Sequence, residues 1–259
     1  MMHGRNYGRN QAYNSSARRQ EVRIQEVNSQ ERRNPNIPSE QSAQIRFFNA
    51  AAGFPPLNIS VEDTVISSSL GFGRVTDYAT VKIGFNSVTV TIAETPNVTL
   101  LTKSIPIRSG DVVTIAIINT AKGIDLKVMN DKGCENVPNT MSCFRVANFS
   151  YTSGPIDVIL EDGKAVFSDV RFKEVTEFKQ AVPGEYNFTV VLTREVTTPE
   201  NKDLNVITEP EPVEEGGYLE GEQEKPVMYF FEDLEAGKSS TSILIGNVNF
   251  EPPLQVVTI

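Results

Sequence analysis

From residue 45 onward, apolar and polar residues alternate in short runs separated by turn-forming residues. Leu57, Ile59 and Val61, for example, share one face of an extended segment, with polar residues between them. Runs of this kind predict strands at 45–49, 57–61, 64–67, 75–83, 87–92, 98–107, 112–118 and 124–129. The strands 98–107 and 112–118 are predicted to pair as a hairpin across the turn 108–111. Because no window of ten residues has helical periodicity, the pattern predicts an all-β, antiparallel sandwich of immunoglobulin-like type.

The same stretch of sequence occurs twice. Five residues recur ninety-nine positions later, namely Arg46, Asn49, Pro56, Glu62 and Asp63 as Arg145, Asn148, Pro155, Glu161 and Asp162. The offset becomes one hundred after Gly163, then 127 at Gly237, and the alignment of Leu254 with Leu126 sets it at 128 near the end. The duplication predicts two tandem sandwiches, the second of which is interrupted by an insertion.

Four segments follow from these patterns. Residues 1–44 are predicted to be a disordered leader, 45–132 the first sandwich, 133–143 a linker and 144–259 the second sandwich. The insertion, at about 196–227, is rich in Pro, Glu and Gly and is predicted to be a mobile excursion from a hairpin. It is interpreted as a tolerated surface insertion, with an acidic docking loop or a weak Ca²⁺ collector as alternatives.

Charge narrows the classes of partner. The net charge is −9, but residues 1–44 carry seven Arg and four Glu, whereas residues 199–235 carry twelve acids and two Lys. An acidic total argues against nucleic acid as the main partner. No apolar run is long enough for a transmembrane helix, and residues 1–44 lack the apolar core of a signal peptide, so export by the general secretory route is not expected.

The composition also limits the chemistry. The only histidine is His3, in the leader, which removes histidine-based acid–base or nucleophilic catalysis from the body of the chain. No phosphate-binding glycine-rich loop is present. No catalytic residue and no cofactor is therefore predicted.

Two cysteines, Cys134 and Cys143, lie at the junction between the repeats. A disulfide between them would close a short loop and stabilise the fold by roughly 2.5 to 3 kcal/mol in the chain-entropy model. Free reduced thiols and a reactive thiol are the alternatives, and two thiols alone make a poor zinc site.

Carboxylates in predicted strand-connecting loops are weak candidates for Ca²⁺. These are Asp63, Asp77, Asp162 and Glu177. An ordinary polar turn explains them equally, because equivalent positions of a duplication lie in different domains. Asn49 and Asn148 are predicted to satisfy backbone groups at a turn.

Four short motifs carry a family resemblance. In the first copy they are Arg46-Phe47-Phe48-Asn49, Pro56-Leu57-Asn58-Ile59, Phe72-Gly73-Arg74-Val75-Thr76-Asp77-Tyr78, and Gly84 ahead of Val88-Thr89-Val90-Thr91. They resemble the domain-of-unknown-function 4397 family over residues 45–259. Asn58, where the family usually has Asp, and Glu177-Phe178, where Asp-Tyr is commoner, depart from the pattern. The resemblance implies a β-sandwich module of bacterial envelope or surface proteins, with a spore layer of Firmicutes as one location, and it implies no catalytic residue.

The leading hypothesis is a non-catalytic structural or interaction protein of a bacterial surface or spore layer. Its expected partners are other surface or coat proteins, or further copies of itself. A cytoplasmic location is the alternative to the surface. The alternative function is a ligand-binding module for a glycan, a peptide or Ca²⁺.

Overall fold

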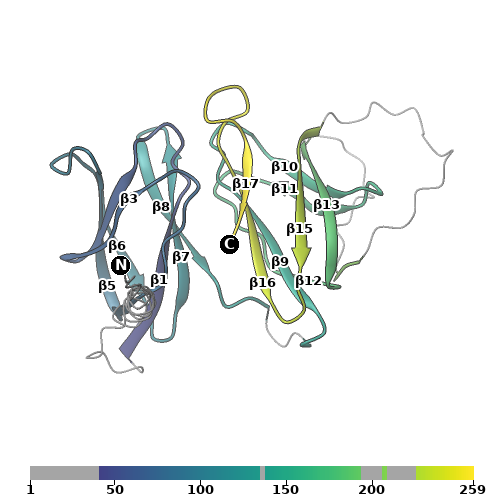
Figure 1. Ribbon diagram of the computed structural model, residues 1–259, viewed down its shortest axis with the longest axis horizontal. Helices are drawn as coiled ribbons and strands as arrows, with labels where there is room; N and C mark the ends of the chain where they lie inside the picture. The colour runs from purple at the N-terminus through teal and green to yellow at the C-terminus, as the bar shows by residue number, and fades with distance from the viewer. Residues whose placement is uncertain (1–40, 135–137, 194–205, 209–225) are drawn as a thin grey trace, which may run out of the picture.

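The computed structural model describes residues 41–134, 138–193, 206–208 and 226–259. These residues form two β-sandwiches side by side, so the prediction of an all-β tandem fold is confirmed (Figure 1). The predictions for residues 1–40 of the leader and for most of the insertion concern residues outside these ranges. Two boundaries were wrong: residues 42–44, predicted to be leader, begin strand β1 (Ser42–Asn49), and residues 142–143, predicted to be linker, begin strand β9 (Ser142–Asn148). Within the ranges, no helix is long and apolar enough to cross a membrane.

The first sandwich contains two four-stranded sheets with the orders β4-β1-β7-β8 and β3-β2-β5-β6. Its strands are β1 (Ser42–Asn49), β2 (Leu57–Val61), β3 (Thr64–Leu70), β4 (Ala79–Lys82), β5 (Gly84–Ile92), β6 (Thr99–Ile107), β7 (Val112–Thr120) and β8 (Gly123–Asn130).

The second sandwich repeats this plan with the sheets β14-β12-β9-β16-β17 and β11-β10-β13-β15. Its strands are β9 (Ser142–Asn148), β10 (Ile156–Leu160), β11 (Ala165–Val170), β12 (Lys179–Ala181), β13 (Gly184–Leu192), β14 (Val206–Ile207), β15 (Pro226–Leu234), β16 (Ser239–Ile245) and β17 (Gln255–Thr258). Strand β14 comes from the insertion, and none of the described strands of the first sandwich corresponds to it.

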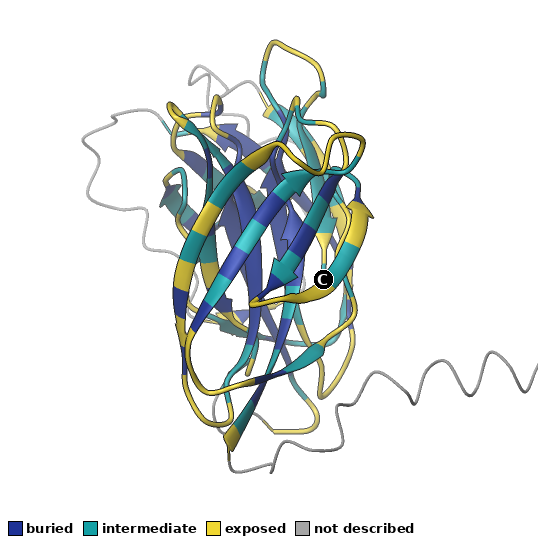
Figure 2. Ribbon diagram, turned by 90° about the vertical axis from the view of Figure 1, so that its left-hand side faces the viewer, coloured by how far each residue is buried: buried dark blue, intermediate teal, exposed yellow. Residues whose placement is uncertain are grey.

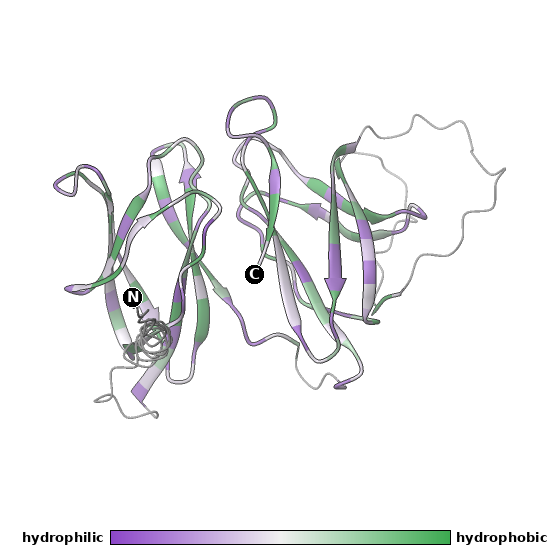
Figure 3. Ribbon diagram, in the orientation of Figure 1, coloured by the Kyte–Doolittle hydropathy of each residue, from purple (hydrophilic) through white to green (hydrophobic). Residues whose placement is uncertain are grey.

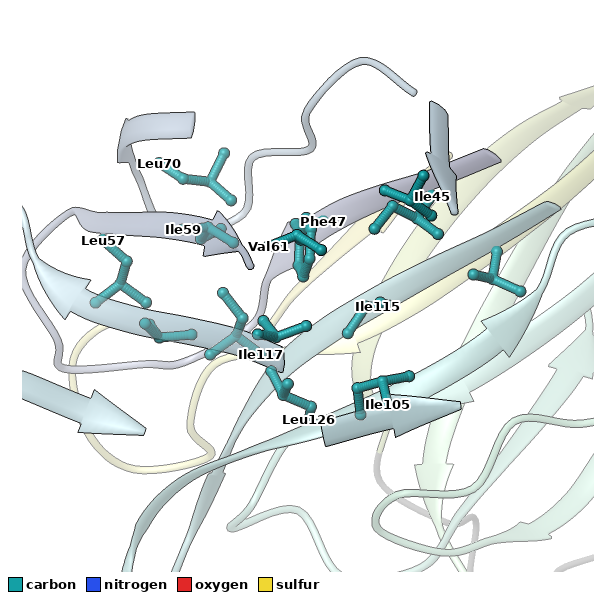
Figure 4. Packing of buried hydrophobic residues seen from close by; sticks show 14 of the residues in the cluster. Ile45, Phe47, Leu57, Ile59, Val61, Leu70, Ile105, Ile115, Ile117 and Leu126 are labelled. Atoms are coloured by element: carbon teal, nitrogen blue, oxygen red, sulfur yellow. The ribbon is translucent and has the colours of Figure 1, made fainter. Parts of the chain in front are cut away.

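Period-two burial explains why these segments are strands. In β2 the side chains of Leu57, Ile59 and Val61 are buried and the residues between them are less so. Together with apolar residues of the facing sheet, such as Phe47 and Ile115, they form the core of the first sandwich (Figure 4). Each buried aliphatic side chain contributes roughly 1.5–3 kcal/mol relative to an exposed one, so the alternating positions are what hold the two sheets together.

The asparagines that follow the first strand of each repeat bind backbone groups, as predicted. Asn49 Nδ2 donates to the carbonyl of Leu70 (3.0 Å), and Asn49 Oδ1 accepts from the amide of Ala51 (3.0 Å). Asn148 makes the same pair of bonds in the second sandwich, to Val170 (3.1 Å) and Ser150 (3.1 Å). Each Asn thus ties the end of its strand to the opposite sheet.

Three sequence-based expectations need correction. Strands β6 and β7 do not form a hairpin, because β6 pairs with β5 while β7 pairs with β1 and β8, so residues 108–111 cross between the sheets. The pairing of β1 with β7 is parallel, and so is that of β9 with β16, within otherwise antiparallel sandwiches. The register of the last strand also differs from the prediction. Val256 pairs with Leu244, and Leu126 pairs with Ile117, the residue equivalent to Leu244. Val256 is therefore the counterpart of Leu126, and the final offset is 130 rather than 128.

The two sandwiches pack against each other through one sheet of each, so the molecule has four layers of sheet (Figure 1). We call the sheets β4-β1-β7-β8 and β14-β12-β9-β16-β17 the inner sheets. A buried cluster joins them, with contributions from both sandwiches: Phe48, Ala50, Ala116, Ile118, Met129, Ala147, Phe149, Ile243 and Ile245. Buried residues accordingly concentrate in the middle of the strands and exposed ones at the loops (Figure 2), and apolar residues follow the strands on both sides of the junction (Figure 3).

Candidate functional site

A polar cluster sits beside this apolar junction, centred on Asp131, the residue after β8. Asp131 Oδ2 accepts hydrogen bonds from the hydroxyls of Thr114 (2.6 Å) and Tyr78 (2.8 Å). Arg46 Nε lies 3.7 Å from the same oxygen, and Arg145 Nη2 lies 3.4 Å from Oδ1. Since Arg145 belongs to the second sandwich, one carboxylate, only 8% exposed, binds groups from both.

The two arginines are equivalent residues of the duplication, and their surroundings are equivalent too. Arg46 Nε donates to Thr114 Oγ1 (2.8 Å), and its guanidinium carbon lies 4.6 Å from the ring centre of Tyr78. In the second sandwich the corresponding distances are 2.9 Å and 4.2 Å, for the set Arg145, Thr241 and Phe178. Within each repeat the arginine thus bonds to the threonine and makes a cation–π contact with the aromatic ring, which explains why the three residues recur together.

The electrostatics of the cluster suit binding rather than proton transfer. Burial, and next the hydrogen bond to Asp131, raise the pKa of Tyr78 to about 12. Burial lowers the pKa of Arg145, against the opposing attraction of Asp131 and Glu177. A tyrosine with a pKa this high stays protonated at neutral pH and donates to the carboxylate. Each group is thereby committed to a neighbour.

Sequence reasoning missed this cluster. It noted Arg46 and Arg145 as matching residues without giving them a role, and it did not single out Asp131. The repeated arginine was the available signal, because a charged residue amid a strand that is otherwise apolar needs a partner. Nothing in the spacing indicated that the partner would be shared between repeats.

A second feature is a cavity of about 700 Å³ that opens between the strands β3 and β4 at one edge of the first sandwich. We call it the edge groove. Its lining is mixed apolar and polar, from the two edge strands and their neighbours: Val61, Glu62, Thr64, Val65, Ile66, Ser67, Ser68, Asp77, Tyr78, Ala79, Thr80, Val81, Lys82 and Asn86. Its volume is that of a typical ligand site.

Two replacements between the repeats account for part of this space. Ser67 stands where the second sandwich has the buried Phe167. Asn86 stands where it has the buried Tyr186, although both donate to an equivalent backbone carbonyl, Asn86 to Lys82 (3.0 Å) and Tyr186 to Val182 (2.7 Å). The first sandwich thus keeps the backbone bond but gives up two aromatic rings.

The weak Ca²⁺ candidates do not converge. Asp63 and Asp162 lie in equivalent turns of different sandwiches, Asp162 with its carboxylate 3.2 Å from Lys164. Asp77 lines the edge groove, and Glu177 lies where it attracts Arg145. Among the described residues, no group of three His, Cys, Asp or Glu is placed to hold a metal ion.

Cys134 and Cys143 are joined in the structure, with Cα atoms 5.9 Å apart. Cys143 lies in β9, the strand that also carries Arg145. The bond therefore ties the segment that leaves β8 to the inner sheet of the second sandwich.

Residues 43–159 match the family described as "Domain of unknown function (DUF4397)". The matched stretch belongs to the DUF4397 family. It runs from β1 to β10, so it covers the whole first sandwich, including Arg46, Tyr78 and Asp131, and reaches Arg145 in the second. Comparison with curated proteins gives no match. The DUF4397 match agrees with the resemblance seen in the motifs and assigns no activity.

Proposed function

We propose that this chain is a non-catalytic structural or interaction protein of a bacterial surface or spore layer. The observation that carries the proposal is the convergence of Arg46 and Arg145 on Asp131. The duplicated residues are used to join two sandwiches into one body.

The chemistry of the chain agrees with a non-catalytic role. The single histidine is His3, far in sequence from the sandwiches. The ionisable groups at the junction hold one another, with Tyr78 and Arg145 both bound to Asp131. General acid–base catalysis needs a group whose pKa lies near the working pH, and Tyr78 at about 12 is far from that.

The proposed location rests on the family resemblance and on the cysteines. A bond between Cys134 and Cys143 persists in an oxidising layer and is reduced in the cytosol of most bacteria. Other coat or surface proteins, or further copies of this chain, are the proposed partners.

Fractionation of cells and spores that make the protein tests this function. The expected result is recovery in the outer layers, with Cys134 and Cys143 resistant to alkylation until a reductant is added. Recovery solely in the soluble cytosol with both thiols freely alkylated would overturn the location. A hydrolase activity that a single carboxylate substitution abolishes would overturn the non-catalytic role.

The edge groove favours a second candidate, a ligand-binding module, and among its possible ligands it favours a peptide. Its walls are two edge strands, β3 and β4, and an exposed strand edge binds extended peptides by main-chain hydrogen bonds. A synthetic peptide copying residues 203–210, which include β14, is a suitable probe. A saturable rise in melting temperature would support this candidate, and no rise at millimolar peptide, either in the wild-type chain or in the Ile24→Asp variant, would refute it.

A further inference from the structure

The second sandwich shows how an edge groove of this fold is filled. Strand β14 pairs in parallel with β12, so that Val206 lies opposite Gln180 and Ile207 opposite Ala181. The amide of Val182 donates to the carbonyl of Ile207 (2.9 Å). The side chain of Ile207 is fully buried in the core cluster of the second sandwich, whereas Val206 is 40% exposed. The edge of β12 is therefore covered by a partly exposed residue, at which a polar side chain would also be accommodated, followed by a buried aliphatic residue.

The first sandwich offers the same edge without such a strand. Strand β4 ends its sheet, and none of the described strands lies on its outer side. Ile66 is only partly buried although its equivalent, Val166, is fully buried, and the neighbouring Val65 is 65% exposed. The turn between β5 and β6 spans residues 93–98 and is too short to supply a strand of its own. The edge groove is thus the open counterpart of a groove that the chain itself fills elsewhere.

The leader contains a segment with the required pattern. Residues 22–27, which lie outside the described ranges, read Val-Arg-Ile-Gln-Glu-Val, so Val22 and Ile24 would share one face of a strand with polar residues on the other. Arg23-Ile24 matches the order of Val206-Ile207, with the residue that stays exposed first. The lining of the groove carries two acidic residues, Glu62 and Asp77, and one basic residue, Lys82, so its net charge is opposite in sign to that of the basic leader.

The direction of the chain also fits. A strand parallel to β4 would end near Lys82, and Lys82 pairs with Ser42 at the start of β1. The amide of Ile83 donates to the carbonyl of Gln41 (3.2 Å), so the leader enters the fold at that same end. Residues 28–40 would have to cross about 10 Å, two strand spacings, and thirteen residues can span about 43 Å. A tethered segment also has a high effective concentration at a nearby site.

We propose that residues 22–27 add to the first sandwich as a strand parallel to β4, with Ile24 inserted into the edge groove as Ile207 is in the second sandwich. This rests on the peptide-binding candidate above and names its ligand as a segment of the same chain. The added strand covers an edge that would otherwise be free to pair with other chains.

Hydrogen exchange measured by mass spectrometry on the full chain tests the proposal. Ile24→Asp is the test variant and Ile37→Asp the matched control, since both make the same change within the leader and only Ile24 belongs to the proposed strand. Residue Lys82 corresponds to Val182, whose amide is bonded to β14. We expect the β4 segment to exchange at least about tenfold faster in Ile24→Asp than in the wild-type chain or in Ile37→Asp.

Equal exchange of β4 in all three proteins would overturn the proposal. Protection that depends on Ile24 but disappears on dilution, with a matching change in size by light scattering, would also overturn it, because the occupant would then be the leader of a second copy. The peptide 203–210 separates the two claims. If it binds wild-type and Ile24→Asp equally, the groove binds peptides but the leader is not its occupant; the proposal expects tighter binding to Ile24→Asp.

Discussion

Replacement of Asp131 by alanine is the most informative single perturbation of the junction. The change removes the carboxylate that binds Arg46, Arg145, Thr114 and Tyr78. Both arginines would be left without their shared counter-charge, and Arg145 is almost fully buried.

The magnitude follows from the burial and the distances. Removing one partner of a buried ion pair costs about 3–5 kcal/mol. Arg46 keeps 18% of its side chain exposed, and the ion-pair distances of 3.7 and 3.4 Å are long. We therefore expect the lower end, a loss of about 3 kcal/mol in the free energy of unfolding. For a chain of this length that corresponds to a fall of about 6–12 °C in melting temperature.

The assay is urea unfolding followed by circular dichroism, with Asp125→Ala as the matched control. Asp125 also forms an ion pair, with Lys103 at 2.6 Å, but its side chain is 35% exposed. An exposed pair contributes about 0–1 kcal/mol, so the control should stay close to the wild type. If Asp131→Ala and Asp125→Ala shift the urea midpoint equally, the shared carboxylate does not hold the sandwiches together and the reasoning is refuted.

Three further predictions test other parts of the fold. Tyr78 should keep its proton up to about pH 12, whereas an unfolded tyrosine loses it near pH 10. Because the folded state binds more protons between these values, the free energy of unfolding should fall as pH rises through them. In Tyr78→Phe the urea midpoint should fall less steeply with pH, and a fall as steep as in the wild type would contradict the assigned pKa. Ile207→Ala should cost about 2–5 kcal/mol because Ile207 is fully buried, while Val206→Ala should cost less than about 1 kcal/mol; equal losses would mean that β14 does not close the core. Deletion of residues 254–259 removes β17, whose Val257 packs at the junction and whose Val256 packs in the second core, so the truncated chain should be insoluble or unfolded by circular dichroism, and a folded truncation would refute this.

The alternation of residues such as Leu57, Ile59 and Val61 was enough to predict strands, because period-two burial is a local property. The duplication could be predicted because residues such as Arg46 and Asn49 recur at a fixed offset. The hairpin prediction at 108–111 failed because turn residues show where a chain reverses without showing whether the next strand joins the same sheet. The predicted register of β17 was wrong by two residues. A shift of two keeps the same side chains facing inward, so the apolar pattern of the sequence fits both alignments.

The junction itself could not be read from the sequence. Ala116 and Ala147 are small residues on the outer faces of two strands, and composition alone does not say that each faces the other sandwich. Asp131 follows β8 as an ordinary polar residue would, and only the packing of the inner sheets brings Arg145 to it. Strand β14 was missed because its two residues lie within an acidic stretch whose average composition opposes folding.

Differential scanning calorimetry of the full chain tests most directly whether the two sandwiches form one body. If the apolar junction and the Asp131 cluster couple them, the wild-type protein should unfold in a single transition whose calorimetric and van't Hoff enthalpies agree. Asp131→Ala should lower that transition or split it. Two separate transitions in the wild-type protein, unaffected by Asp131→Ala, would contradict the account.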